Sequence, residues 1–148
     1  MEGQFSKQVE AVFAKDGPLS KATENYVPRA SQIEYACSVA EALETGESLV
    51  AEAGTGTGKT FAYLVPALLH SGRVLVSTAG KTLQDQLYFK DIPAILKALS
   101  MGARIALLKG RANYICKLRL EHACEENAAK SREEVVHLQK IQRFAQQS

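Results

Sequence analysis

Residues 53–60 read Ala-Gly-Thr-Gly-Thr-Gly-Lys-Thr, a glycine-rich turn that ends in a lysine and a threonine. Glycines let the backbone turn tightly while its N–H groups point at a bound anion. A helix that starts directly after such a turn adds the positive end of its dipole. Lys59 supplies a point charge for β- and γ-phosphates, and the hydroxyl of Thr60 is suited to binding Mg²⁺. The stretch therefore predicts a phosphate-binding loop.

The sequence on either side supports this interpretation. A short strand candidate, residues 48–52, precedes the loop, and a helix candidate, residues 59–70, follows it. The loop fits the Walker A pattern in its relaxed form, with alanine at the first position. A nucleoside triphosphate with Mg²⁺ is the indicated ligand class, and a chance glycine-rich turn is the alternative. The residues predicted to contact the nucleotide are Ala53, Gly54, Thr55, Gly56, Thr57, Gly58, Lys59 and Thr60, with Thr60 also the predicted Mg²⁺ ligand.

Further from the loop, strands alternate with helices in the predicted order of elements. Two more short apolar runs, residues 73–77 and 104–108, are typical of buried strands. This alternation favours a parallel sheet with helices on both faces, so the predicted fold class is α/β. So few strands make a narrow sheet, because about five or six are usual. The strand pattern therefore indicates part of a larger domain.

Periodic apolar residues and helix-end signals define the predicted helices. Ser31 with Glu34, and Ser131 with Glu134, fit capping boxes that satisfy N–H groups at a helix start. Gly46 is a candidate C-terminal stop. The predicted helices cover residues 5–15, 31–46, 59–70, 81–88, 91–100, 114–126 and 131–146.

Composition excludes several classes of protein. The chain has 148 residues, 46% of them hydrophobic, and a formal net charge of +2. No apolar run approaches the roughly 20 residues that span a bilayer, and the N-terminus lacks the apolar core of a secretory signal. Three cysteines, Cys37, Cys116 and Cys124, favour a reduced compartment over a disulfide framework. We therefore expect a cytoplasmic protein with no membrane partner, in which any nucleic-acid surface is a local patch.

A Walker A loop alone does not distinguish kinases, GTPases, transporter ATPases and helicases, but the flanking motifs resemble one family. Residues 52–60 resemble motif I of superfamily 2 helicases of the XPD/DinG type, and residues 77–87 resemble motif Ia. Arg29 and Gln32 stand in an R-x-x-Q arrangement similar to the Q motif that reads adenine in that family. Residues 107–116 resemble the K-G-R-x-N-Y-x-C segment. The resemblance covers residues 26–120 and is greatest to the bacterial YoaA/DinG-like branch.

The resemblance implies an ATP-dependent, 5′→3′ DNA helicase of replication or repair, associated with the bacterial nucleoid when bound to DNA. Its nucleotide would be ATP with Mg²⁺, Lys59 and Thr60 its catalytic residues, and Gln32 its adenine reader. Its DNA partner would be a single strand or a 5′-tailed duplex. The residues implied to contact the DNA backbone are Ser77, Thr78, Lys81 and Gln84.

The resemblance also divides the chain into domains. Residues 1–30 would be an N-terminal leader, with an irregular stretch from residue 16. Residues 31–110 would be the first part of a RecA-like P-loop NTPase domain, the first motor domain. Residues 111–148 would begin an iron–sulfur insertion. Cys116 would then be the first of four ligands to a 4Fe–4S cluster, with the other three beyond residue 148, because Cys124 and His122 have no recognised ligand spacing.

The residues to which the resemblance assigns these roles are also compatible with ordinary structural roles. Gln32 is also compatible with a solvated helix residue, and the motif Ia residues with an ordinary surface loop. No acidic D-E-x-H motif, which would hold Mg²⁺ and orient water, occurs in the chain. We therefore expect an N-terminal fragment that binds ATP and Mg²⁺ without turnover. The competing hypotheses are a small P-loop phosphotransferase and a non-catalytic module that binds a nucleotide or a partner.

Overall fold

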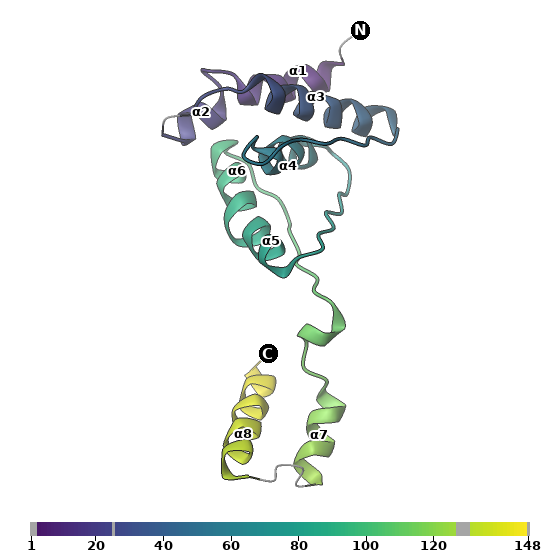
Figure 1. The fold of residues 1–148 in the computed structure, drawn as a ribbon, viewed down its shortest axis with the longest axis vertical. Coiled ribbons are helices and arrows are strands. Elements are labelled where there is room, and N and C mark those ends of the chain that lie inside the picture. The colour runs from purple at the N-terminus through teal and green to yellow at the C-terminus, as the bar shows by residue number, and fades with distance from the viewer. Residues whose placement is uncertain (1–2, 25, 127–130, 148) are drawn as a thin grey trace. The chain divides into compact units, whose positions relative to one another are not determined.

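The computed structural model describes residues 3–24, 26–126 and 131–147. Within these residues the chain is helical or irregular, and it separates into two compact units, residues 1–106 and 107–148. Figure 1 shows the helices of each unit. In chain order the helices are α1 (Gln4–Phe13), α2 (Pro18–Ala22), α3 (Ala30–Thr45), α4 (Lys59–Leu69), α5 (Lys81–Gln86), η1 (Leu87–Asp91), α6 (Ile92–Ala98), η2 (Arg111–Asn113), α7 (Lys117–Glu125) and α8 (Arg132–Gln147).

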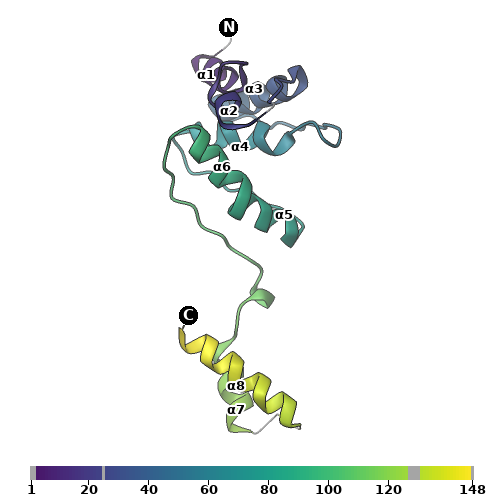
Figure 2. The same cartoon turned by 90° about the vertical axis from the view of Figure 1, so that its left-hand side faces the viewer.

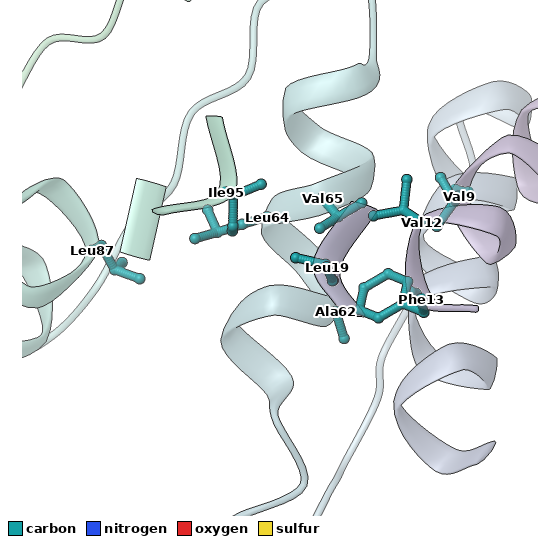
Figure 3. Close-up of a cluster of buried hydrophobic side chains, with 11 residues drawn as sticks. Val9, Val12, Phe13, Leu19, Ala62, Leu64, Val65, Leu87 and Ile95 are labelled. Atoms are coloured by element: carbon teal, nitrogen blue, oxygen red, sulfur yellow. The ribbon is translucent and has the colours of Figure 1, made fainter. Parts of the chain in front are cut away.

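The core of the first unit forms where α1, α3, α4 and α6 pack together (Figures 1 and 2). Ala36 and Ala40 of α3 lie one turn apart on the same face, and their small side chains let the neighbouring helices approach closely. Figure 3 shows the larger buried side chains around α4. The buried core residues are Val9, Val12, Phe13, Leu19, Ala36, Ala40, Ala62, Leu64, Val65, Leu87 and Ile95.

The stretch from residue 16 that we predicted to be irregular contains a short helix instead. Pro18 occupies the first turn of α2, where its missing N–H costs nothing. Leu19 is fully buried in the common core, and Gly17 is buried where a Cβ would collide with the carbonyl of Ala11. Tyr26 then donates a hydrogen bond to the carbonyl of Phe13 over 3.2 Å. The N-terminal residues are therefore part of the core of this unit.

Helix α3 starts at Ala30, and the predicted capping box of Ser31 with Glu34 is wrong. The structure shows no side-chain cap, and Ser31 lies inside the helix. Arg29, extended after Pro28, is the N-cap, and its carbonyl accepts hydrogen bonds from the N–H groups of Gln32 and Ile33. Because this backbone turn begins the helix one residue early, Ser31 cannot cap it. The predicted stop at Gly46 is confirmed by its left-handed φ of 72°.

The two helices predicted over residues 81–88 and 91–100 are one continuous helical segment. Helices α5 and α6 are joined by η1, a π-helical turn. The wide turn comes just before Pro93, which has no N–H to donate to the carbonyl four residues back. A π-helical turn changes that bonding pattern locally, so the segment passes the proline without ending.

The predicted strands at residues 48–52, 73–77 and 104–108 are not formed in the structure, which contains no strand among the residues it describes. A helix satisfies its own hydrogen bonds, whereas a strand needs a neighbouring backbone to form a ladder. The side chains of Val50 and Leu75 are 99% and 93% exposed, although their sequence pattern is that of buried strands. The helical part of the α/β prediction is therefore observed, and the parallel sheet is not confirmed.

The second unit contains η2 and the helices α7 and α8, which lie side by side (Figures 1 and 2). The capping role of Ser131 is confirmed, because its hydroxyl accepts a hydrogen bond from the N–H of Glu134 over 3.2 Å. Helix α7 begins at Lys117, three residues later than predicted. Tyr114 is extended, and its hydroxyl accepts a hydrogen bond from the N–H of Lys109, which closes the turn before the helix.

Among the described helices, none has both the length and the apolar character needed to cross a lipid bilayer.

The packing around α4 predicts different costs for one substitution at two positions. Val65→Ala, at a fully buried site, is expected to lower the free energy of unfolding by about 2 kcal/mol, because it removes methyl groups and leaves a cavity. Val50→Ala is the matched control and should change the stability by less than about 0.5 kcal/mol, since Val50 is exposed. Urea unfolding followed by circular dichroism measures both. Equal losses would contradict the core described above.

Candidate phosphate-binding loop

The glycine-rich loop lies directly before α4, so its backbone leads into the N-terminal end of that helix. Gly56 and Gly58 have φ angles of 75° and 81°, in the left-handed region that glycine adopts without a steric penalty. Gly58 is the N-cap of α4, and Lys59 and Thr60 form its first turn. The predicted order of loop, lysine, threonine and helix is therefore observed, with a backbone that only glycine readily adopts at two positions.

Two side chains at the start of α3 donate hydrogen bonds to carbonyls of this loop. The amide Nε2 of Gln32 donates to the carbonyl of Gly58 over 2.9 Å, and the guanidinium of Arg29 donates to the carbonyl of Gly56. Gln32 is only 8% exposed, so the alternative of a solvated helix residue is wrong. A Cβ on Gly58 would collide with the Gln32 amide. The R-x-x-Q residues and the loop are therefore in direct contact.

Lys59 and Thr57 bond to the loop itself. The ammonium of Lys59 donates to the carbonyls of Ala53 and Gly54, over 2.5 and 3.0 Å. The hydroxyl of Thr57 also donates to Gly54, over 3.0 Å. The positive charge of Lys59 is thus held at the beginning of the loop by two backbone oxygens.

Thr60 has a neighbour that sequence reasoning missed. Tyr63, three residues later on α4, forms a hydrogen bond with the Thr60 side chain. Burial raises the pKa of the Tyr63 phenol, the hydrogen bond with Thr60 lowers it, and the nearby charge of Asp91 raises it. The three-residue spacing places Thr60 and Tyr63 on one helix face, which is the signal that could have found this pair. The predicted Mg²⁺ ligand is therefore oriented by a tyrosine.

The four candidate DNA-contacting residues lie around the start of α5. Ser77 and Lys81 are exposed, whereas Thr78 and Gln84 are half-buried. The hydroxyl of Thr78 donates to the carbonyl of Gly80 over 3.3 Å, and the N–H of Gln84 donates to the same carbonyl over 3.1 Å. These two hydrogen bonds connect the segment before α5 to the first turn of that helix, and Lys81 is the first residue of the helix.

Comparison with protein families places this loop in a known context. Residues 34–126, which include the whole loop, match the model of the DEAD/DEAH box helicases. The chain belongs to this helicase family. Membership implies a RecA-like fold. No solved structure matches the chain.

Individual relatives agree with the family assignment of this helicase chain. It is 44% identical over 140 residues to the ATP-dependent DNA helicase YoaA of Haemophilus influenzae. This alignment covers 95% of the chain and 22% of that protein. It is 54% identical over 109 residues to YoaA of Escherichia coli, covering 74% of the chain and 17% of the relative. It is 47% identical over 103 residues to the ATP-dependent helicase DinG of Mycobacterium tuberculosis, and that alignment covers 64% of the chain and 16% of DinG. The chain thus spans about a fifth of the length of these curated relatives.

Cys116 belongs to the second unit, residues 107–148. It is exposed and forms the N-cap of α7, and its carbonyl accepts a hydrogen bond from the N–H of Leu120. Cys124, on the same helix, is half-buried. In the part of the chain that the structure describes, no three His, Cys, Asp or Glu side chains come together as a metal site. The described residues alone therefore do not fit a 4Fe–4S cluster, which needs four ligands.

The contact between Gly58 and Gln32 predicts a strong effect of a single methyl group. Gly58→Ala is expected to destabilise the helicase chain by about 2 kcal/mol or more, because the left-handed backbone becomes strained and the new Cβ collides with the buried amide. Gly80→Ala is the control, since its φ is negative and its Cβ would meet nothing within 4 Å. Chemical unfolding measures both variants. A Gly58→Ala chain as stable as the parent would refute the described contact.

Proposed function

We propose that this chain is the ATP-binding, N-terminal part of an ATP-dependent DNA helicase. The observation that carries the proposal is the loop of residues 53–60, which lies inside the helicase match and has its carbonyls held from α3. The names of the relatives, ATP-dependent DNA helicases YoaA and DinG, support ATP and DNA as the ligands. The motifs resemble those of enzymes that translocate 5′→3′ on a single strand or a 5′-tailed duplex.

Binding of ATP would begin with a movement of Lys59. Its ammonium lies on the carbonyls of Ala53 and Gly54, so it has to leave these oxygens to contact the β- and γ-phosphates. The phosphates supply stronger, charged acceptors than the two carbonyls, which favours the exchange. The loop N–H groups and the end of α4 would bind the remaining phosphate oxygens. Thr60 would bind Mg²⁺ once its hydroxyl turns from Tyr63.

Gln32 is proposed to contact the adenine as well as the loop. Its side-chain amide has two N–H donors and one carbonyl acceptor, and the bond to Gly58 uses one donor. The second donor and the acceptor match the paired donor and acceptor on the adenine edge. Gln32 would therefore join recognition of the base to the shape of the phosphate loop.

The proposed DNA-binding residues are Ser77, Thr78, Lys81 and Gln84. Lys81 is exposed at the start of α5, where its charge is available to a phosphate. The hydroxyl and amide side chains of the other three suit phosphate and sugar contacts, which fix a backbone without reading its sequence.

We also propose the domain division that the motifs indicate: residues 1–30 as a leader, whose helices α1 and α2 pack into the core of the same unit, 31–110 as the first part of motor domain 1 and 111–148 as the start of an iron–sulfur insertion. Residues 48–52, 73–77 and 104–108 are proposed to form strands of the RecA-like sheet in a longer polypeptide. The exposed apolar side chains of the first two segments support this, because a sheet would bury them.

The finer part of the proposal concerns Cys116 as one ligand of a 4Fe–4S cluster. Its exposure on an N-cap leaves the thiol accessible to a metal. The remaining three ligands would come from elsewhere in a longer polypeptide, whose cysteine thiolates would complete the set.

The 148-residue chain by itself is proposed to bind ATP and Mg²⁺ without hydrolysis. Its sequence contains no D-E-x-H motif, and the acidic pairs Glu125-Glu126 and Glu133-Glu134 are exposed, at the end of α7 and in the first turn of α8. Without such an acidic group, no carboxylate assists Thr60 in holding Mg²⁺ or orients the attacking water. This observation favours a nucleotide-binding module as the function of the isolated chain.

The loop assignment predicts the effect of removing one charge. In the full-length gene product, Lys59→Ala is expected to lower DNA-stimulated ATP hydrolysis and unwinding of a 5′-tailed duplex by at least about a hundredfold, since the transferred phosphate loses its cation. Lys97→Ala, on the exposed side of α6, is the control and should leave both rates unchanged. A Lys59→Ala protein that unwinds at the parent rate would show that the loop does not serve ATP.

The cluster assignment predicts a difference between two cysteines. In the full-length gene product purified without oxygen, Cys116→Ser should lose most of the bound iron and acid-labile sulfide, because a serine hydroxyl is a poor ligand for the cluster iron. Cys124→Ser should retain both, because Cys124 is not a proposed ligand. Iron and sulfide analysis, with the visible absorbance of the cluster, measures the difference. Full iron content in the Cys116→Ser protein would refute the role of this cysteine.

A further inference from the structure

Carbonyl groups of the phosphate loop accept hydrogen bonds from side chains at Ala53, Gly54, Gly56 and Gly58. Inside the loop, Thr57 and Lys59 donate to Gly54 and Ala53. From outside it, Arg29 donates to Gly56 and Gln32 donates to Gly58. The two outside donors come from the start of one helix, and they reach the two loop residues with left-handed backbones. The start of α3 therefore determines how these two peptide groups are oriented.

Because the peptide bond is planar, the hydrogen bonds to the Gly56 and Gly58 carbonyls also fix the direction of the N–H groups that follow them. In a trans peptide, the carbonyl of one residue and the N–H of the next point in opposite directions. A donor that holds the Gly56 carbonyl therefore aims the N–H of Thr57, and one that holds the Gly58 carbonyl aims the N–H of Lys59. An anion bound on the side of the loop opposite the Arg29 and Gln32 side chains would meet these N–H groups.

The backbone of Arg29 is well placed for this task. Pro28 precedes it, and its own carbonyl accepts hydrogen bonds from the N–H groups of Gln32 and Ile33, so its main chain is fixed at the N-cap. A side chain on a fixed main chain loses less freedom when it makes a bond, which strengthens the net contribution of that bond. The positive charge of the guanidinium also makes its hydrogen bond to a carbonyl oxygen stronger than a bond between two neutral groups.

We propose that Arg29 is a positioning residue of the phosphate loop, which holds the Gly56 carbonyl so that the N–H of Thr57 points at the phosphates. The inference rests on the proposed nucleotide site. It differs from a reading in which the R-x-x-Q arginine recognises adenine, because loop support does not depend on the base. Arg29 therefore contributes equally to the binding of ATP and of a triphosphate that carries no base.

The experiment compares Mg²⁺-ATP with Mg²⁺-tripolyphosphate, each titrated into the full-length gene product by calorimetry. Arg29→Met keeps the length of the side chain and removes its donors. It should weaken both ligands by a similar factor of about ten, the effect of losing one charge-assisted hydrogen bond. Arg29→Lys keeps a donor and should bind both ligands within about threefold of the parent. Arg73→Ala, at an exposed arginine outside the site, is the control and should not change either affinity.

Each outcome decides between the readings. Equal loss for both ligands, recovered by lysine and with unchanged thermal unfolding, supports the positioning role. A loss confined to ATP shows that Arg29 reads the base, and unchanged affinity for both shows that it does nothing for the loop; either result overturns the inference. A parent protein that binds neither ligand overturns the proposed nucleotide site and the inference with it. Arg29→Ala serves as the second donor-free variant if Arg29→Met does not fold.

Discussion

The hydrogen bond from the buried Gln32 amide to the Gly58 carbonyl joins the beginnings of two helices, and the loop between them depends on it. A buried amide left without a partner costs about 1–3 kcal/mol, so this bond is expensive to break. It also requires a glycine, since any Cβ at position 58 would occupy the space of the amide. The core of α1, α3 and α4 keeps the two ends together by burying Ala36, Ala40 and Val65. The loop thus derives its shape from helix packing rather than from its own sequence alone.

Features governed by local signals could be predicted from the sequence. The glycines, Lys59 and Thr60 specify the loop and the start of α4, and Gly46 specifies the end of α3. The capping box at Ser31 could not be predicted correctly, because a competing signal, the extended backbone of Arg29 after Pro28, starts the helix earlier. The short helix α2 was missed because its stability comes from burying Leu19 in a core built by distant residues. At α2, tertiary packing overrides local propensity, whereas at Ser31 one local signal overrides another.

A different physical reason explains why the predicted strands are not formed. Residues 48–52 and 73–77 have the composition of buried strands, yet a strand exists only when a neighbouring backbone completes its ladder. For the site, the residue types at Gln32 and Arg29 indicate hydrogen bonding, but only the structure shows that both donate to the loop. The hydrogen bond between Thr60 and Tyr63 could have been predicted from their three-residue spacing on a helix, but it was not predicted. The sequence therefore indicates which side chains can form hydrogen bonds, whereas the structure is needed to identify their partners.

The exposed extended segments also bear on how such a chain behaves in solution. Val50 and Leu75 belong to β-prone stretches whose apolar side chains meet water. Stretches of this kind are templates for pairing with the same stretch in another molecule. The 148-residue chain is thus suited to self-association that grows with concentration, and a chaperone that recognises extended apolar segments would find its targets on either side of α4. The two exposed apolar stretches would then be the segments that limit the solubility of this chain.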